Sequence, residues 1–391
     1  MGFWNGRLTF TRFRVQGQTP LPLGEELLEQ AREHRIGLHG GGRGADGVAT
    51  GWAGGDHVLD TTIDYAKNIV DDAVHLAVRV DADKIPGSLL KAYTQMEIDA
   101  VAQLNPSGTA TKAQKAEAKE AAKLRLEAEA ADGRFQRMSH TPVLWDAREG
   151  IVYVGATTGS ILERAIGLFR ETFNLPLEPI TAGELARATA QAAGVDADRA
   201  VAMLEGAPLR LVGSSGASNV VAWNEENPSS LDSLGNEFLV WAWHRLQIDG
   251  DTIPLSDGSE IALMLARTLT LDCPRGETGR DQLTDGSPTR LPEALRALQS
   301  GKLPRKAGLI MARQGSQYEL TLQAETLAVS NASLPKAEGK LAPHESRIHR
   351  LESLRHLAQT LDLLFAAYLS RRMSSAWSDE LGRIESWLRA A

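Results

Sequence analysis

Four lysines repeat at spacings of three and four residues in the segment 111–137: Lys112, Lys115, Lys119 and Lys123. At about 100° per residue, an α-helix places them within an arc of about 80° on one face. Ammonium groups neutralise phosphates, and the release of counterions then provides affinity for duplex DNA without sequence preference. The alternative interpretation is a solvated Lys/Glu helix that is held by charge pairs four residues apart.

An aromatic residue between two arginines follows this helix, as Arg134, Phe135 and Arg137. Guanidinium groups contact phosphates, and an aromatic ring can contact sugar edges or wedge near a groove. We therefore expect Phe135 at the tip of a basic helical arm, with the two arginines on phosphates.

A metal-dependent nuclease uses clustered carboxylates, often beside a lysine, to hold Mg²⁺ and to position water. Asp81, Asp83 and Lys84 follow a predicted strand, and Glu117 and Lys119 give a second, weaker match. The first set is equally a polar strand end, and the second arises from composition alone. Our main prediction therefore includes no cofactor and no metal site. The rival hypothesis is a Mg²⁺-dependent nuclease that uses Asp81 and Asp83.

The net charge of the 391 residues is −8, which taken alone argues against a polyanion partner. The charge is uneven, however: residues 141–264 carry seven basic and seventeen acidic side chains, and residues 265–315 carry nine and five. The lone Cys273 excludes a disulfide within the chain and a cysteine-rich zinc site. The apolar runs are shorter than the ~20 residues of a membrane helix, so we expect a cytoplasmic protein with no membrane partner.

Hydrophobic periodicity predicts mixed strands and helices without sustained βαβ alternation, which is typical of the α+β class. Expected helices are 86–104, 111–131, 158–173 and 231–246, and expected strands are 8–15, 74–80, 143–145, 151–155, 261–271, 307–312 and 318–323. A leucine-rich stripe from Leu351 to Tyr368 predicts a long C-terminal helix that packs one side on the core or on a partner.

Breaks in composition divide the chain into three expected parts. These are an N-terminal α+β domain with a basic helical arm (1–180, arm 86–137), a second α+β domain (181–343) and a C-terminal helical element (344–391). An interaction module that uses the Leu351–Tyr368 stripe is a third functional hypothesis.

The order of several short segments resembles that of the RdgC recombination-associated proteins. The segments are Gly2–Leu8, Gly51–Trp52, Arg134–Thr141, Trp145–Asp146, Gly150–Val154, Asn174–Leu177 and, more faintly, Ser300–Lys302. None of them is a catalytic signature, so their order carries the resemblance.

The resemblance implies a non-enzymatic protein that binds double-stranded DNA as a ring-shaped homodimer, associates with the nucleoid and restrains the access of RecA recombinase to DNA. Phe135 matches the family's DNA-proximal aromatic residue. Arg275, Arg280 and Lys302 fall near the basic lining of the ring and are expected to form a second basic surface. An exonuclease activity has also been attributed to the family, so a Mg²⁺-dependent exonuclease stays the alternative.

Overall fold

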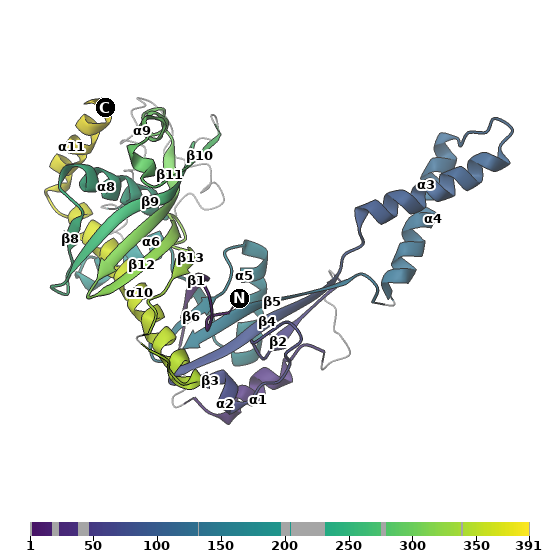
Figure 1. Ribbon diagram of the computed structural model, residues 1–391, viewed down its shortest axis with the longest axis horizontal. Coiled ribbons are helices and arrows are strands. Elements are labelled where there is room, and N and C mark those ends of the chain that lie inside the picture. Colours follow the sequence, from purple (N-terminus) through teal and green to yellow (C-terminus); the bar gives the residue numbers. More distant parts are fainter. Residues whose placement is uncertain are drawn as a thin grey trace. The chain divides into compact units, whose positions relative to one another are not determined.

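The computed structural model describes residues 2–17, 23–37, 47–131, 133–196, 204, 231–274, 279–337 and 339–390. Helices and antiparallel strands are mixed along the chain, which confirms the predicted α+β class. The chain forms two compact units (Figure 1). Unit 1 comprises 1–23, 69–75 and 142–391, and unit 2 comprises 24–68 and 76–141. The expected boundaries at residues 180 and 343 divide the chain into consecutive segments, and that division stays a prediction.

Unit 1 is built on an antiparallel sheet with the strand order β10-β9-β11-β12-β13-β1-β6-β5. The bounds are β1 Leu8–Val15, β5 Gln136–Asp146, β6 Ile151–Val154, β9 Glu260–Asp272, β10 Arg280–Asp285, β11 Leu303–Arg313, β12 Ser316–Gln323 and β13 Val329–Ser333. Short strands add to it: β3 (Ile69–Val70) pairs with β4 (Ala73–Asp83), β7 (Leu177–Pro179) with β1, and β8 (Thr252–Pro254) with β9. The strands β4 and β5 each run from one unit into the other.

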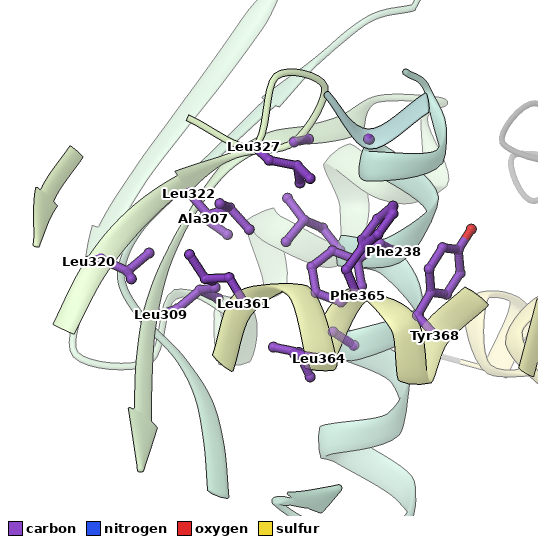
Figure 2. Packing of buried hydrophobic residues seen from close by; sticks show 14 of the residues in the cluster. Phe238, Ala307, Leu309, Leu320, Leu322, Leu327, Leu361, Leu364, Phe365 and Tyr368 are labelled. Atoms are coloured by element: carbon purple, nitrogen blue, oxygen red, sulfur yellow. The ribbon is translucent and has the colours of Figure 1, made fainter. Parts of the chain in front are cut away.

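The helices of unit 1 pack on this sheet. They are α5 Gly159–Phe173, α6 Ala182–Ala192, α8 Leu234–Ile248, α9 Pro292–Gln299, α10 Pro343–Arg372 and α11 Trp377–Ala390, with a 3-10 turn at Pro288–Arg290. In Figure 2 the rings of Phe238, Phe365 and Tyr368 meet beside leucines of β11 and β12. The predicted Leu351–Tyr368 stripe on α10 is buried in this core, so it is not a free partner surface.

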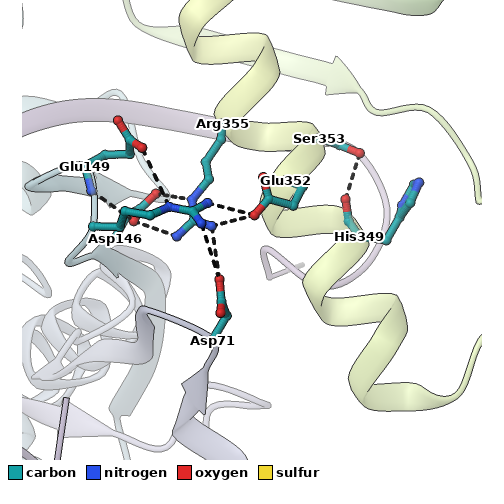
Figure 3. A network of polar contacts seen from close by, with 8 residues as sticks. Asp71, Asp146, Glu149, His349, Glu352, Ser353 and Arg355 are labelled. Carbon is teal, nitrogen blue, oxygen red and sulfur yellow. Dashed lines mark hydrogen bonds and ion pairs between the residues drawn. The ribbon is translucent and has the colours of Figure 1, made fainter. Parts of the chain in front are cut away.

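Buried polar groups fix α10 to the sheet. The Arg355 guanidinium donates to both carboxylate oxygens of Asp146, at 2.6 and 2.8 Å, and also reaches Asp71 and Glu352 (Figure 3). Asp146 is fully buried. A buried charge is tolerated when it is paired and hydrogen-bonded, so this network holds α10 in one position against the end of β5.

His356 on α10 joins a second polar cluster. Its Nδ1 lies 2.7 Å from the Tyr318 hydroxyl, and its Nε2 lies 3.3 Å from Arg313. Burial, followed by the charge of Arg313, lowers the pKa of His356. The fold therefore favours the neutral form of the imidazole.

This lowered pKa predicts a loss of stability in mild acid. The unfolded imidazole, with a pKa of about 6.5, binds a proton more readily than the folded one, so the free energy of unfolding should fall as the pH drops below about 6.5. Urea unfolding at pH 7.5 and 5.0 should show this loss, and His356→Gln, which cannot titrate, should lose less. Equal losses in the two proteins would contradict the assignment to His356.

Gly308 on β11 sits where the β9–β11 register shifts, and a Cβ there would lie 1.9 Å from the backbone oxygen of Ala266. Because the obstacle is backbone, Gly308→Ala should destabilise the protein by about 3 kcal/mol or more. Gly167, in the middle of α5, has open space at its Cβ position. The control Gly167→Ala should stabilise the protein by about 0.5–1 kcal/mol. Urea midpoints measure both, and a wild-type midpoint for Gly308→Ala would contradict the expected clash.

Unit 2 contains α1 (Glu25–Glu33), β2 (Val48–Ala53) and α2 (Tyr65–Asn68), with β2 paired antiparallel to the second half of β4. It also contains two long helices, α3 (Gly87–Leu104) and α4 (Lys112–Ala131), as predicted from the sequence. The chain enters α3 from β4 and leaves α4 into β5 (Figure 1). The two helices form the hairpin described next.

Candidate nucleic-acid interface

The helix α4 forms because it is composed of Ala, Lys, Glu, Leu, Arg and one Gln, which are strong helix formers. A reciprocal capping box begins the helix: the Thr111 hydroxyl accepts from the backbone N–H of Gln114 at 3.3 Å, and the Gln114 side chain accepts from that of Thr111 at 2.9 Å. Gln114 also bonds Asn105 at the end of α3, closing the loop between the helices. Thus, the loop residues 105–111 form the tip of the hairpin.

The face of α4 that packs on α3 repeats every four residues, as Ala118, Ala122, Leu126 and Ala130, all buried. Lys119 and Lys123 each directly follow one of these residues, and Lys115 follows the half-buried Gln114. We call Lys112, Lys115, Lys119 and Lys123 the lysine row. Because the row repeats with the packed residues, it follows one side of the helix contact over about 16 Å.

The lysine row is exposed and poorly neutralised. Lys123 approaches Glu127 at 3.7 Å, with both side chains about half exposed. In the part of the chain that the structure describes, Lys112, Lys115 and Lys119 have no ion-pair partner. Duplex DNA carries one phosphate per 3.4 Å along each strand, so the row spans about five phosphates.

The position of Phe135 corrects the expectation that it forms the tip of the arm. The Phe135 carbonyl oxygen accepts from the backbone N–H of Lys84 at 3.0 Å, which joins the two ends of the hairpin. Phe135 therefore lies at the base, because α4 runs back antiparallel to α3 before the chain reaches it. It is half-buried, with Arg134 and Arg137 exposed beside it in sequence.

Sequence reasoning missed Lys84 as part of this group. Lys84 is exposed and its backbone contacts Phe135. We call Lys84, Arg134, Phe135 and Arg137 the base cluster. In the sequence, Lys84 stands at the end of a predicted strand, and this position predicts only a part of the rival metal site.

Some basic groups of the hairpin are already engaged. The Arg134 guanidinium donates to Glu129 at 3.0 Å. Arg125 lies 4.3 Å above the Tyr93 ring and 3.6 Å from the same glutamate. The contact of Arg125 with Tyr93 ties α4 to α3, and the ion pairs with Glu129 reduce the charge that the two arginines present to a partner. Among the described residues of the hairpin, the lysine row is therefore the largest group of basic side chains that mostly lack ion pairs.

The expected second basic surface is placed only in part. Arg275 lies outside the described residues. Arg280, on the edge strand β10, is exposed and paired with Asp272 at 3.0 Å. Lys302 is only 8% exposed, and its ammonium donates to Asp281 at 2.7 Å. Arg280 and Lys302 thus act first as partners of aspartates in unit 1.

A polar sheet face was also missed by sequence reasoning. Alternate side chains of β9, β11 and β12 stay exposed or half-exposed, opposite the buried core positions. Lys306 is exposed beside Gln323 in the register, whereas Arg7 and Arg267 both approach the carboxylate of Glu319, at 3.6 and 3.4 Å. The alternation along the predicted strands was the signal that could have identified this face.

Asp81, one of the two carboxylates of the rival hypothesis, is engaged otherwise, and Asp83 is half-buried at the end of the same strand. Asp81 is buried, and both of its oxygens accept from the Arg79 guanidinium at 2.8 Å. Across the residues that the structure describes, no three His, Cys, Asp or Glu side chains are grouped so that they could hold a metal ion. The geometry here is that of an ion pair at a strand end.

A scan against protein-family models gives no match, and no curated protein matches the chain. The resemblance to the RdgC family therefore rests on the segments quoted above, and its implications are taken up as a proposal. None of the described helices combines the length and the apolar composition needed to cross a membrane.

Proposed function

We propose that this protein binds double-stranded DNA without sequence preference through the lysine row and the base cluster. The observation that carries the proposal is the exposed lysine row, in which Lys112, Lys115 and Lys119 lack an ion-pair partner among the described residues. Lysine side chains are flexible point charges that suit phosphates rather than base edges. A row of this kind contacts the phosphate backbone of DNA and does not discriminate between base sequences.

The finer parts of the proposal rest on the resemblance. It supports an N-terminal domain with a projecting arm, a homodimer that closes into a ring around the duplex, and a nucleoid-associated role in which bound protein limits the access of RecA recombinase. Phe135 at the base of the hairpin contacts the sugar edges, and Arg280, from the second basic surface that the resemblance implies, supplies a weaker contact. The exposed Lys306 of β11 is a further candidate that the resemblance does not imply. The acidic segment 141–264 marks the surface that stays away from DNA.

Gel-shift binding to linear and closed circular duplexes of one sequence, across a salt series, tests this function. We expect affinity for both forms that falls steeply with salt. A ring should be retained on circles after transfer to high salt and should slide off linear ends. Salt-insensitive binding, or no binding, would contradict the proposed function. Equal release from circular and linear duplexes would contradict the closed ring.

The same reactions with Mg²⁺ or Mn²⁺ address the exonuclease alternative. We expect the linear duplex to stay intact. Degradation that is lost in Asp81→Asn would replace the binding proposal with the nuclease.

A further inference from the structure

A groove of about 530 Å³ lies in unit 1 between α6, α10 and the strand β6. Its apolar lining comes from both helices and from β6, as Ile151, Leu185, Ala358, Leu363 and Ala366. Its polar lining includes Arg148, Glu149, Tyr153, Arg355 and Asp362. The volume lies within the range of about 300–1,000 Å³ that is usual for small-molecule sites.

The buried donors that line this groove are already used. The Arg355 guanidinium bonds Asp146, Asp71 and Glu352 (Figure 3). Both ring nitrogens of His356 lie within hydrogen-bond distance of neighbouring side chains. A ligand that needs donors, such as a phosphate or a carboxylate, therefore finds few in the buried part of the groove.

The acceptors, in contrast, are in excess. Glu149 is half exposed, and the Arg148 Nε approaches its carboxylate only at 3.8 Å. Each oxygen of Asp362 accepts a single N–H from Arg12 and can accept another. The ion pairs around the groove contain three arginines (Arg12, Arg148 and Arg355) and five carboxylates (Asp71, Asp146, Glu149, Glu352 and Asp362).

Tyr153 adds an independent observation. Its side chain is 1% exposed and lines the groove. Tyr153 stands directly opposite Arg12 in the β1–β6 register, and in the described part of the chain its hydroxyl has no hydrogen-bond partner. The hydroxyl oxygen is not among the fully buried side-chain atoms that lack a partner, so it is open to the groove that Tyr153 lines and can bond a ligand there.

We infer that this groove binds an aliphatic ammonium ion, as carried by a linear diamine or polyamine. Glu149, Asp362 and the Tyr153 oxygen supply the acceptors of the groove for ammonium N–H groups, and Leu185 and Leu363 supply apolar lining for the methylenes. The cation offsets the excess of carboxylates, and the chain covers the apolar wall. This site is separate from the lysine row and does not depend on DNA binding.

Isothermal titration of the full chain with cadaverine tests this inference, at a constant ionic strength of about 0.15 M so that surface charge is screened. We expect saturable heat for one site and none with 1,5-pentanediol, which has the same length without charge. Glu149→Gln and Tyr153→Phe should each weaken binding by about tenfold. The control Glu171→Gln, an exposed glutamate on α5, should bind as the wild type does.

Tyr153→Phe separates a binding role from a structural one. Because the hydroxyl has no hydrogen-bond partner among the described residues, its removal should leave the urea midpoint unchanged while the affinity for cadaverine falls. Absence of saturable heat, equal affinity in all the variants, or an equal loss in Glu171→Gln would overturn the inference. Each of these outcomes leaves the proposed DNA binding untouched.

Discussion

Replacing Lys112, Lys115, Lys119 and Lys123 by alanine should weaken binding to duplex DNA by about three orders of magnitude at 0.1 M salt. Each phosphate contact adds about 0.9 to the slope of log affinity against log salt, so four contacts account for about 3.6. The variant should therefore show both the lower affinity and a shallower slope. Gel shifts or fluorescence anisotropy between about 50 and 200 mM salt measure the two quantities together.

Folding is not expected to confound this result, because alanine is the strongest helix former and the four side chains are exposed on α4. Lys336 and Lys340 are exposed lysines ahead of α10, and Lys336→Ala/Lys340→Ala is a control that removes two positive charges outside the lysine row. If the control lowered affinity as much as the quadruple variant, the lysine row would have no special role. If the slope of log affinity against log salt were unchanged in the quadruple variant, the lysine row would not be part of the DNA interface.

Asp146→Ala should destabilise the protein by about 3–5 kcal/mol. The substitution leaves the Arg355 guanidinium, whose side chain is 7% exposed, without its main partner, and an uncompensated buried charge is costly. The double variant Asp146→Ala/Arg355→Met should recover much of this loss, since two apolar groups replace the pair. Urea unfolding of the three proteins measures the difference.

Glu352→Gln serves as the control for this pair, because Glu352 is half exposed although it bonds the same arginine. An exposed ion pair contributes about 0–1 kcal/mol, so this variant should stay close to the wild type. A loss in Glu352→Gln as large as that in Asp146→Ala would show that burial does not determine the effect.

Long elements with a clear period could be predicted from the sequence. The 111–131 segment is a continuous run of helix formers between a capping box and a glycine, and α4 spans Lys112–Ala131. The stripe from Leu351 to Tyr368 repeats at helical spacing, and its residues are buried along α10. In both cases the local preference and the final packing agree.

Shorter or more polar elements were not predicted. The strand β10, with the sequence Arg-Asp-Gln-Leu-Thr-Asp, has few strand-forming residues and exists because β9 pairs with it. The first half of β5, from Gln136 to Ser139, is exposed and lacks alternation. Pairing with strands that are distant in the sequence stabilises these strands, and no local residue pattern predicts that pairing.

The site residues show the same limit. The lysine row follows from helix geometry alone, so its shared face was accessible from spacing. Phe135 was misplaced at the tip because sequence order gives the end of a helix but not the direction in which the helix runs. The burial of Lys302 against Asp281 depends on a fold contact between residues 21 positions apart, which charge counting cannot detect.

The place of β1 in the sheet has a consequence for how the chain acquires its structure. Leu8 and Phe10 pair with Ala332 and Val329, and the next residues of the same strand pair with β6. At a synthesis rate of about 5–20 residues per second, β13 follows β1 by about 15–65 s. Until β13 is made, the Leu8–Phe10 part of β1 lacks its partner strand and is an unpaired strand edge, which invites pairing with other chains. Assembly of unit 1 therefore depends on very distant contacts, and we expect slow refolding that is sensitive to protein concentration.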